Sequence, residues 1–445
     1  MVGSETTIGW AIAVMLMVAA AALGCEDDSG GGAATSVGGG ASGGSGSAGG
    51  AVGGGGTGTG EPCADHCDNG VQDCDELWID CGGSCAACGP ALEVNGRWLG
   101  VRGTDGSWKV AIGSGTLFSV AFYQAVGDEF DAIVADGKNL VFLWAGAGAA
   151  EGPDQLPMYV GHDFDGGFDE AHWSTLLDFV DDATDRGLGV LVALFATVAL
   201  EYEAGARWDR NVWNASYGHG GPYDLTVNCG KDAFYSFGSY GTPIYTPGDD
   251  YPASADTLVR GQWRQEEIVH RAATELAGRR NVAIYLMWEG YDLSAGLPGS
   301  GGQCETTADK QQGWHDHMAG FIRSVGGPML VTTMDTDLRQ MSALDFGVIE
   351  SSHRRTWAVN NADIVTWPVV TTGFSPGGGT ADIASIREGW LHGIQQGPPF
   401  WEYRSNLCPD CAPPTQYVRD LRPILDTITT WDDEPGDELT DASLP

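Results

Sequence analysis

Eight short hydrophobic runs occur along the chain between about Pro90 and Asp432, and each has the length of a β-strand. Polar residues do not alternate within them, which is typical of parallel strands buried on both faces. The runs are WKVAI from Trp108, NLVFLWA from Asn139, GVLVALFA from Gly189, NVAIYLMWE from Asn281, PMLVTT from Pro328, FGVIES from Phe346, PVVTTG from Pro368 and PPFWEY from Pro398.

Between several of these runs the apolar residues follow a helical period instead. They recur every three or four positions, so each predicted helix has one apolar face. A closing helix is predicted in QYVRDLRPILDTITTW, from Gln416. The other periodic positions are Leu176, Leu177, Val180 and Ala183; Ile268, Val269, Ala272, Ala273 and Leu276; and Ile383, Ile386, Trp390 and Ile394.

Strands that alternate with helices predict an α/β fold. Eight of them over residues 90–432 predict a (β/α)8 TIM barrel with long loops after the strands. A doubly wound open sheet is the alternative. In a barrel of this kind the active site lies at the C-terminal ends of the strands, so the residues that follow the runs are the candidate site residues.

The segments that flank the predicted barrel differ from it in amino-acid composition. Residues 26–61 form a disordered linker, because 17 of the 31 residues from Gly30 to Gly60 are glycine and cannot bury a core. Residues 62–89 form a small cysteine-rich module, and residues 433–445 form an acidic tail.

The N-terminus predicts export. Residues 1–25 contain an apolar run that ends in AALGC, which resembles a bacterial lipoprotein lipobox, and the resemblance implies that Cys25 is lipidated. An ordinary signal peptide or an uncleaved anchor is the alternative. The lipoprotein interpretation implies a place in the cell envelope, anchored to the membrane or cell surface.

The other ten cysteines are an even number, as disulfide pairing in an oxidising compartment requires. We expect a disulfide between Cys229 and Cys304, which follow the third and fourth runs, and one between Cys408 and Cys411. A zinc site at Cys81, Cys85 and Cys88 is the alternative within the module. Its six cysteines are Cys63, Cys67, Cys74, Cys81, Cys85 and Cys88, and the sequence does not fix their pairing.

The chain carries 22 basic and 60 acidic residues, for a formal charge of −38. Such a surface repels nucleic acid, so a nucleic-acid partner is not expected. We also expect a monomer. We expect no metal or cofactor, because no H-E-x-x-H motif is present. His315 and His317 are two residues apart on a predicted helix and so point in different directions.

Glu289 ends the fourth run, at the predicted mouth of the barrel. A carboxylate at the end of a buried strand is costly unless it is paired or used. Trp288 and Tyr291 provide apolar surroundings, which suit a general acid that must hold its proton near neutral pH.

Longer stretches around this glutamate resemble the clan A glycoside hydrolases. They are WNASYGHGGPYD…DAFYS from Trp213, WRQEEIVHRAATELAGRRNVAIYLMWE from Trp263 and FWEYR from Phe400. The resemblance covers about Gly96 to Trp431. It implies a retaining (β/α)8 barrel with Glu289 as acid/base on strand four, a nucleophile on strand seven and a sugar-stacking Trp401 on strand eight.

Three positions depart from that family. Trp288 stands where an asparagine usually precedes the acid/base, and Trp144 stands near the usual arginine of strand two. Strand seven reads PVVTTG, with Thr372 and Gly373 where the nucleophile is expected, and no carboxylate follows until Asp382.

A partner for Glu289 must therefore come from another strand. Glu350 ends the sixth run and Glu402 lies in the eighth, and we favour Glu402 slightly because Trp401 and Tyr403 flank it. Strand alternation, however, would turn Trp401 and Glu402 to opposite faces. Each glutamate also has a structural alternative as the ion-pair partner of a nearby arginine.

The predicted ligand is a polysaccharide or oligosaccharide, because aromatic rings suit the apolar faces of sugars. The alternative to hydrolysis is an inactive barrel that binds glycan or presents an interaction surface. Packing within their own loop is the alternative role for the aromatic side chains after strand three. The candidate sugar-binding residues are Trp213, Asn214, Trp288, Tyr291, His353, Trp401 and Tyr403.

Overall fold

The computed structural model describes residues 89–120, 127–146, 158–160, 164–196, 212–215, 220–223, 231–236, 241–288, 308–334, 343–349, 359, 367–371, 383–397, 412–428, 439 and 442–445. Residues 23–88, which include the predicted linker and all but one residue of the predicted cysteine-rich module, lie outside the described part of the chain. All eleven cysteines lie outside it as well. The predicted lipidation and disulfides therefore remain predictions.

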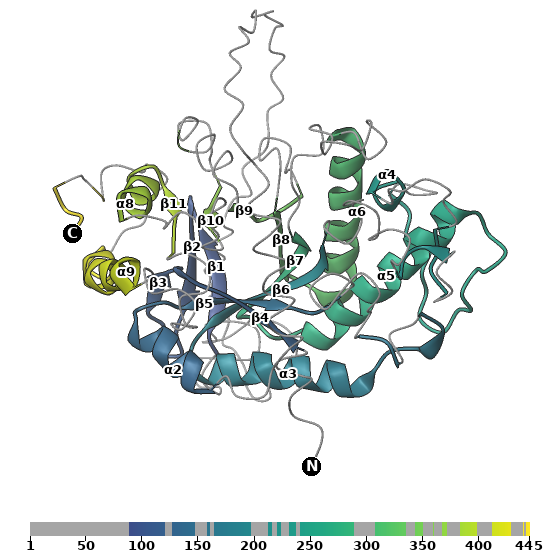
Figure 1. Cartoon of the computed structure of the whole chain (residues 1–445), viewed down its shortest axis with the longest axis horizontal. Helices are drawn as coiled ribbons and strands as arrows, with labels where there is room; N and C mark the ends of the chain where they lie inside the picture. The colour runs from purple at the N-terminus through teal and green to yellow at the C-terminus, as the bar shows by residue number, and fades with distance from the viewer. Residues whose placement is uncertain are drawn as a thin grey trace, which may run out of the picture. The chain divides into compact units, whose positions relative to one another are not determined.

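Eight parallel strands form one sheet in chain order (Figure 1). Its two end strands approach each other, because a methyl group built on Gly397 would lie 2.4 Å from the carbonyl oxygen of Gly113. The sheet is therefore a nearly closed barrel, which confirms the predicted fold class. The strands are β4 (Gly113–Ser119), β5 (Leu140–Trp144), β6 (Gly189–Ala196), β7 (Val282–Trp288), β8 (Leu330–Met334), β9 (Phe346–Ile349), β10 (Val369–Thr371) and β11 (Ile394–Gln395).

Helices follow most of these strands and cover the outside of the barrel. Figure 1 shows α2 and α3 along one side of the strands, and α8 and α9 on the opposite side from α5 and α6. Asp169 and Asp256 begin α3 and α5 by accepting hydrogen bonds from backbone N–H groups of the first turn. The helices are α2 (Gly127–Ala135), α3 (Glu170–Asp185), α4 (Lys231–Phe234), α5 (Thr257–Leu276), α6 (Ala308–Gly326), α8 (Ile383–Leu391) and α9 (Ala412–Leu425), with a 3-10 turn, η4 (Phe164–Gly166).

The first barrel strand is not the one that the sequence predicts. The run from Trp108 instead gives β3 (Trp108–Val110), the third strand of an antiparallel sheet with β1 (Ala91–Asn95) and β2 (Trp98–Arg102). The barrel begins with β4, whose Gly-Ser-Gly start is a weak strand former. Glycine suits this position because a methyl group on Gly113 would approach the Thr371 carbonyl oxygen to 3.0 Å.

The small antiparallel sheet fills the N-terminal end of the barrel. Leu92, Leu99 and Val101 pack in one cluster with the inward side chains of the barrel strands. Gln395 of β11 also points to this sheet: its amide accepts from the Leu99 backbone N–H at 2.7 Å and donates to the carbonyls of Leu99 and Ala111, each at 2.8 Å. This buried amide joins the last barrel strand to the sheet.

The eighth strand therefore begins at Ile394, earlier than the predicted run from Pro398. Ile394 itself belongs to β11 and not to the helix that its spacing predicts, because α8 ends at Leu391 and Gly393 turns the chain with φ 74°. Residues 398–411 lie outside the described part of the chain.

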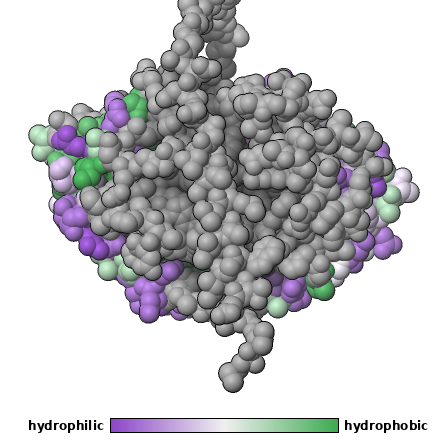
Figure 2. Space-filling view, viewed as in Figure 1, coloured by the Kyte–Doolittle hydropathy of each residue, from purple (hydrophilic) through white to green (hydrophobic). Residues whose placement is uncertain are grey.

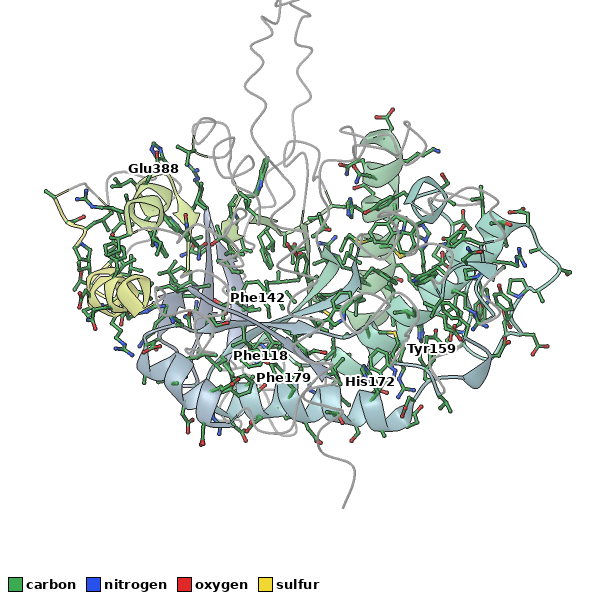
Figure 3. All side chains as sticks on the ribbon, in the orientation of Figure 1. Phe118, Phe142, Tyr159, His172, Phe179 and Glu388 are labelled. Atoms are coloured by element: carbon green, nitrogen blue, oxygen red, sulfur yellow. The ribbon has the colours of Figure 1, made fainter. Side chains whose placement is uncertain are left out.

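A second apolar layer lies between the barrel and its helices. In Figure 3, Phe118 of β4 and Phe179 of α3 point toward each other, and their ring centroids are 5.3 Å apart. The outward residues Val190, Val192 and Leu194 of β6 belong to the same layer. Burial of each side chain of this size contributes roughly 1.5–3 kcal/mol, so the two apolar layers dominate the stability of the barrel.

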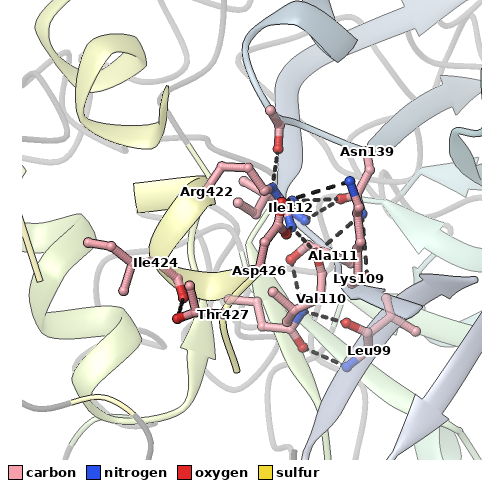
Figure 4. Close-up of polar contacts among 12 residues, drawn as sticks. Leu99, Lys109, Val110, Ala111, Ile112, Asn139, Arg422, Ile424, Asp426 and Thr427 are labelled. Carbon is pink, nitrogen blue, oxygen red and sulfur yellow. Dashed lines mark hydrogen bonds and ion pairs between the residues drawn. The ribbon is translucent and has the colours of Figure 1, made fainter. Parts of the chain in front are cut away.

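Arg422 joins α9 to the barrel (Figure 4). Its guanidinium is buried and donates to the carbonyls of Gly137 at 2.6 Å and Val110 at 3.1 Å, and to Asn139 Oδ1 at 3.3 Å. Asn139 Oδ1 also accepts from the Ile112 backbone N–H at 2.8 Å. These bonds satisfy buried backbone groups on both sides of the start of β4.

The surface of the described residues is mostly polar. Figure 2 shows hydrophilic side chains, with scattered hydrophobic ones, over the described part of the face that it draws. Within these residues no helix is both long and apolar enough to cross a membrane. In the C-terminal segment, Leu439 and Leu444 are buried and pack with Trp390 and Tyr417.

Candidate active site at the mouth of the barrel

The C-terminal ends of the barrel strands define the mouth, and the strand register sorts their inward side chains into layers. Trp144, Ala193, Tyr285, Thr332 and Phe346 are level with one another across five neighbouring strands. Each is at most 1% exposed. Three of these five side chains are aromatic rings, so side chains fill this part of the interior.

The next layer toward the mouth is apolar in the described strands. Phe195 is level with Met287, and Val348 is level with Val370. All four side chains are buried. Val348 and Val370 belong to the inward cluster, whereas Phe195 and Met287 belong to the apolar layer that packs against the helices.

Trp144 ends β5, near the position where the resembled family carries an arginine. It is fully buried and packs inside the barrel with Phe142 and Tyr285. This end of the second barrel strand thus supplies an aromatic ring to the interior and no cation.

Most of the predicted site residues lie outside the described part of the chain. Trp288 is the last residue of β7, where its backbone pairs with Ala196 of β6. Its side chain is not described. The residues outside the described part are the candidate catalytic residues Glu289, Glu350 and Glu402 and the candidate sugar-binding residues Tyr291, His353, Trp401 and Tyr403.

Trp213 and Asn214 are described, and both are buried, at 1% and 3% exposure. The ring of Trp213 lies 5.0 Å from Phe164, 6.0 Å from Phe195 and 5.2 Å from Phe234, measured between centroids. Its described contacts are packing contacts. A sugar-binding role for the two residues stays a prediction.

Three more rings complete a cluster that packs on the end of β6. Phe195 also lies 6.0 Å from Trp314 of α6, and Tyr223 lies 6.4 Å from Phe234. We call Trp213, Tyr223, Phe234, Tyr235 and Trp314 the ring cluster. It draws together residues 212–215, 220–223 and 231–236 of the connection between β6 and α5, and it contacts the mouth through Phe195.

Two adjacent polar residues of α5 hold this connection, and sequence reasoning missed both. Gln265 and Glu266 are fully buried. Glu266 accepts from the backbone N–H groups of Ile244 and Tyr245 at 2.8 and 2.7 Å, and its other oxygen binds Gln262 and His317, each at 2.7 Å. Polar residues next to the apolar positions Ile268 and Val269 were the available signal, since buried polar groups need partners.

His315 is buried beside the ring cluster. Its ring lies 5.0 Å from Trp314 and 6.2 Å from Tyr235, and its Nε2 has no hydrogen-bond partner. Burial lowers the pKa of His315 to about 3, so the ring is neutral at physiological pH. His315 and His317 do face different neighbours, as their spacing predicts.

The described residues contain no group of three or more His, Cys, Asp or Glu side chains that is arranged to hold a metal ion. Elsewhere near the mouth, burial raises the pKa of Tyr223, and burial, followed by the charge of Glu267, raises that of Tyr159. Both phenols are therefore neutral hydrogen-bonding groups.

No protein-family model matches the chain, and no curated protein matches it either. Among solved structures, similar ones include an endo-β-1,4-mannanase from Thermotoga petrophila, at 12% identity and a TM-score of 0.45, over 71% of this chain and 77% of that one. A β-1,4-D-mannanase from Cryptopygus antarcticus shows 12% identity and a TM-score of 0.42, over 78% and 97% of the two chains. An endo-1,4-β-mannanase from Eisenia fetida shows 14% identity and a TM-score of 0.42, over 75% and 95%. Likeness at this level does not bear on activity, and the assignment of the barrel depends on its own strand order.

Proposed function

We propose that the chain is a glycoside hydrolase that acts on an extracellular polysaccharide, with Glu289 as its general acid/base. The register of β7, β8 and β9 carries this proposal. Tyr285, Thr332 and Phe346 are level with one another, and Tyr285 and Phe346 face the interior. Glu289 and Glu350 each follow four residues later.

Side chains alternate along a strand, so residues four apart share a face. If the register continues, Glu289 and Glu350 are level and both face inward. Two strand spacings separate their backbones by about 10 Å, and inward side chains converge from there. Such a pair reaches the carboxyl separations of roughly 5–9.5 Å that glycosidases use.

This argument favours Glu350 over Glu402 as the second carboxylate. Glu402 lies seven residues beyond Gln395, the last residue of β11. The Gln396 N–H donates to the Ile394 carbonyl at 2.9 Å, which is a turn and not a continued strand. No strand register therefore extends to Glu402, whereas Glu350 directly follows β9. In the proposed reaction, Glu289 protonates the glycosidic oxygen, while Glu350 either activates water or attacks the anomeric carbon.

The test is reducing-sugar release from a panel of soluble mannan, xylan, glucan and cellulose derivatives by the full chain. The Glu289→Gln variant runs beside it, because this change preserves size and removes the acid. We expect release that falls by about 10²–10⁴-fold in the variant. Equal release by both proteins would exclude Glu289, and no release from any substrate by the parent would contradict hydrolysis of the tested glycans.

A second candidate function is glycan binding without hydrolysis. The observation that favours it is the end of β10, the seventh barrel strand, where Val370 and Thr371 stand and no carboxylate lies between Asp363 and Asp382. Under this alternative, affinity electrophoresis on the same polysaccharides would show retarded migration, equal for parent and Glu289→Gln, with no sugar released.

We further propose that the chain is exported and held in the cell envelope through a lipid on Cys25, with the glycine-rich linker as a tether. The AALGC sequence supports this proposal. Expression in a bacterial host with a radiolabelled fatty acid tests it. The parent should incorporate label and the Cys25→Ser variant should not, while equal labelling of the two would reject Cys25 as the site.

A further inference from the structure

Gln265 uses its whole side-chain amide to bind three separate parts of the chain. Its Nε2 donates to the Tyr223 hydroxyl at 2.6 Å and to the Phe234 carbonyl at 3.0 Å. Its Oε1 accepts from Trp314 Nε1 at 2.5 Å. Gln265 is fully buried, so water cannot replace these partners if the amide is removed.

The three partners are members of the ring cluster, and the cluster touches the mouth. Phe195, near the C-terminal end of β6, lies 5.4 Å from Phe234 and 6.0 Å from Trp314. Phe195 is level with Met287 of β7. Met287 is two residues before Glu289, so one unbroken series of contacts leads from Gln265 to the strand end that carries the proposed acid/base.

We propose that Gln265 is a positioning residue: it orients the ring cluster against Phe195 and so fixes the end of β7, which the proposed acid/base follows in the sequence. The inference rests on the proposed function for its catalytic readout. A neutral amide suits this place because it donates twice and accepts once without burying a charge.

Rings alone would pack here without an amide, but their orientations would not be unique. A buried amide with fixed donors and an acceptor selects one arrangement, because any rotation of Tyr223 or Trp314 leaves a polar group unpaired. A displacement of about 1 Å at a catalytic group can cost roughly 10²-fold in rate, so an error in this arrangement reaches catalysis.

The experiment compares Gln265→Leu, which removes all three bonds, with Gln265→Glu, which keeps the bond from Trp314 Nε1 and can accept from the Tyr223 hydroxyl but has no donor for the Phe234 carbonyl. Glu267→Gln is the matched control. Glu267 follows on the same helix, but it binds Arg264 and the Tyr159 hydroxyl, at 2.8 and 2.9 Å, and not the ring cluster. Each full-length variant is assayed for kcat and KM on the polysaccharide that the parent hydrolyses best, and for amide hydrogen exchange in a peptide that spans 282–288.

We expect Gln265→Leu to lower kcat about tenfold, with KM within about twofold of the parent, and to speed exchange at the end of β7. Gln265→Glu should recover only part of the lost kcat, because it leaves the Phe234 carbonyl without its donor and buries a carboxyl group. Glu267→Gln should leave kcat and that exchange unchanged, even where it lowers the melting temperature. Equal kcat losses in Gln265→Leu and Glu267→Gln would overturn the proposal, as would unchanged exchange at the end of β7.

Tyr223→Phe provides the test if Gln265→Leu does not fold, because it removes one hydroxyl and keeps the ring. It should lower kcat about two- to threefold and speed the same exchange, and an unchanged kcat would overturn the proposal. A parent without activity would contradict the proposed hydrolase instead. In that event, the exchange comparison of Gln265→Leu or Tyr223→Phe with Glu267→Gln still decides whether the amide positions the strand end.

Discussion

At the scale of single residues, the burial of His315 gives the protein a defined sensitivity to acid. The folded chain holds this ring neutral, because burial lowers its pKa to about 3 from the ordinary value of 6.5. The unfolded chain binds a proton below pH 6.5, while the folded chain does not. Protonation of His315 therefore favours the unfolded chain. The free energy of unfolding is unaffected by this group above pH 6.5 and falls as the pH drops from 6.5 toward 3.

We accordingly expect His315→Phe to reduce the loss of stability between pH 6.5 and pH 5. The parent should lose about 2 kcal/mol through this group over that range, at about 1.4 kcal/mol per pH unit. Urea unfolding at both pH values measures the change in the free energy of unfolding. Carboxylates titrate in both the parent and the variant, so their effect cancels when the two proteins are compared. His392→Gln, at a half-buried histidine after α8, serves as control. A parent-like loss in His315→Phe would show that His315 is protonated in the folded state.

Arg422 makes a second residue-scale prediction. Burial lowers the pKa of its guanidinium, yet the group donates to two backbone carbonyls and to Asn139. Arg422→Met would leave the Gly137 carbonyl without this donor and would remove one of two donors from both the Val110 carbonyl and Asn139 Oδ1, at a cost of about 2 kcal/mol in the free energy of unfolding. Lys109→Met is a matched control, because Lys109 also approaches Asp426, at 3.8 Å, but is 53% exposed.

Urea unfolding should separate the two variants, since an exposed ion pair contributes at most about 1 kcal/mol. Losses of similar size would mean that the carbonyls near Arg422 find other donors. A much smaller loss in Arg422→Met than in Lys109→Met would contradict the structural role of the bonds in Figure 4.

At the scale of elements, the choice between Glu350 and Glu402 depends on which one follows a paired strand. Glu350 directly follows β9 in the same register as Glu289 follows β7, whereas Glu402 lies seven residues beyond the end of β11. We expect Glu350→Gln to lower kcat/KM by roughly 10²–10⁴-fold and Glu402→Gln to change it by less than about tenfold. Circular dichroism checks that both variants fold. The reverse order of effects would identify Glu402 as the second carboxylate and would contradict the choice of Glu350.

The sequence pattern predicts an element well where burial of that element's own faces determines which of its residues are apolar. The runs from Asn139, Gly189 and Asn281 become β5, β6 and β7, and the spacing of Leu176, Val180 and Ala183 becomes α3. The predicted first barrel strand was wrong because WKVAI is the stronger strand former locally, whereas GSGTLFS occupies the space between β5 and the last strand, β11. That contact is not visible in a local pattern.

The site is less predictable for a related reason. Gln265, Glu266 and Gln395 are polar and buried, and most of their partners lie 21 to 296 residues away. The local sequence pattern shows only that these positions are polar, and it does not identify the distant residues that bind them. Glu289 could be predicted because its position follows from strand order in the barrel, a rule that holds for the whole fold, and its role stays a prediction.

At the scale of the whole molecule, the charge of −38 limits which polysaccharides can reach the mouth. A field of this sign repels polyanions over a Debye length, which is about 8 Å in physiological salt and roughly 30 Å at low salt. Neutral glycans are not affected. We therefore expect affinity for a neutral glucan or mannan to stay within about twofold when NaCl falls from about 150 mM to about 10 mM.

A polyuronate offered to the same protein should behave differently. Its apparent affinity should fall severalfold over the same change, because the repulsion is less screened. Affinity electrophoresis or calorimetry at the two salt concentrations measures both ligands on one preparation, and an uncharged osmolyte at matched osmolality controls for effects on the polymer. Stronger binding of polyuronate at low salt would mean that a basic surface lines its path, in opposition to the net charge, and would make an acidic polysaccharide the better candidate substrate.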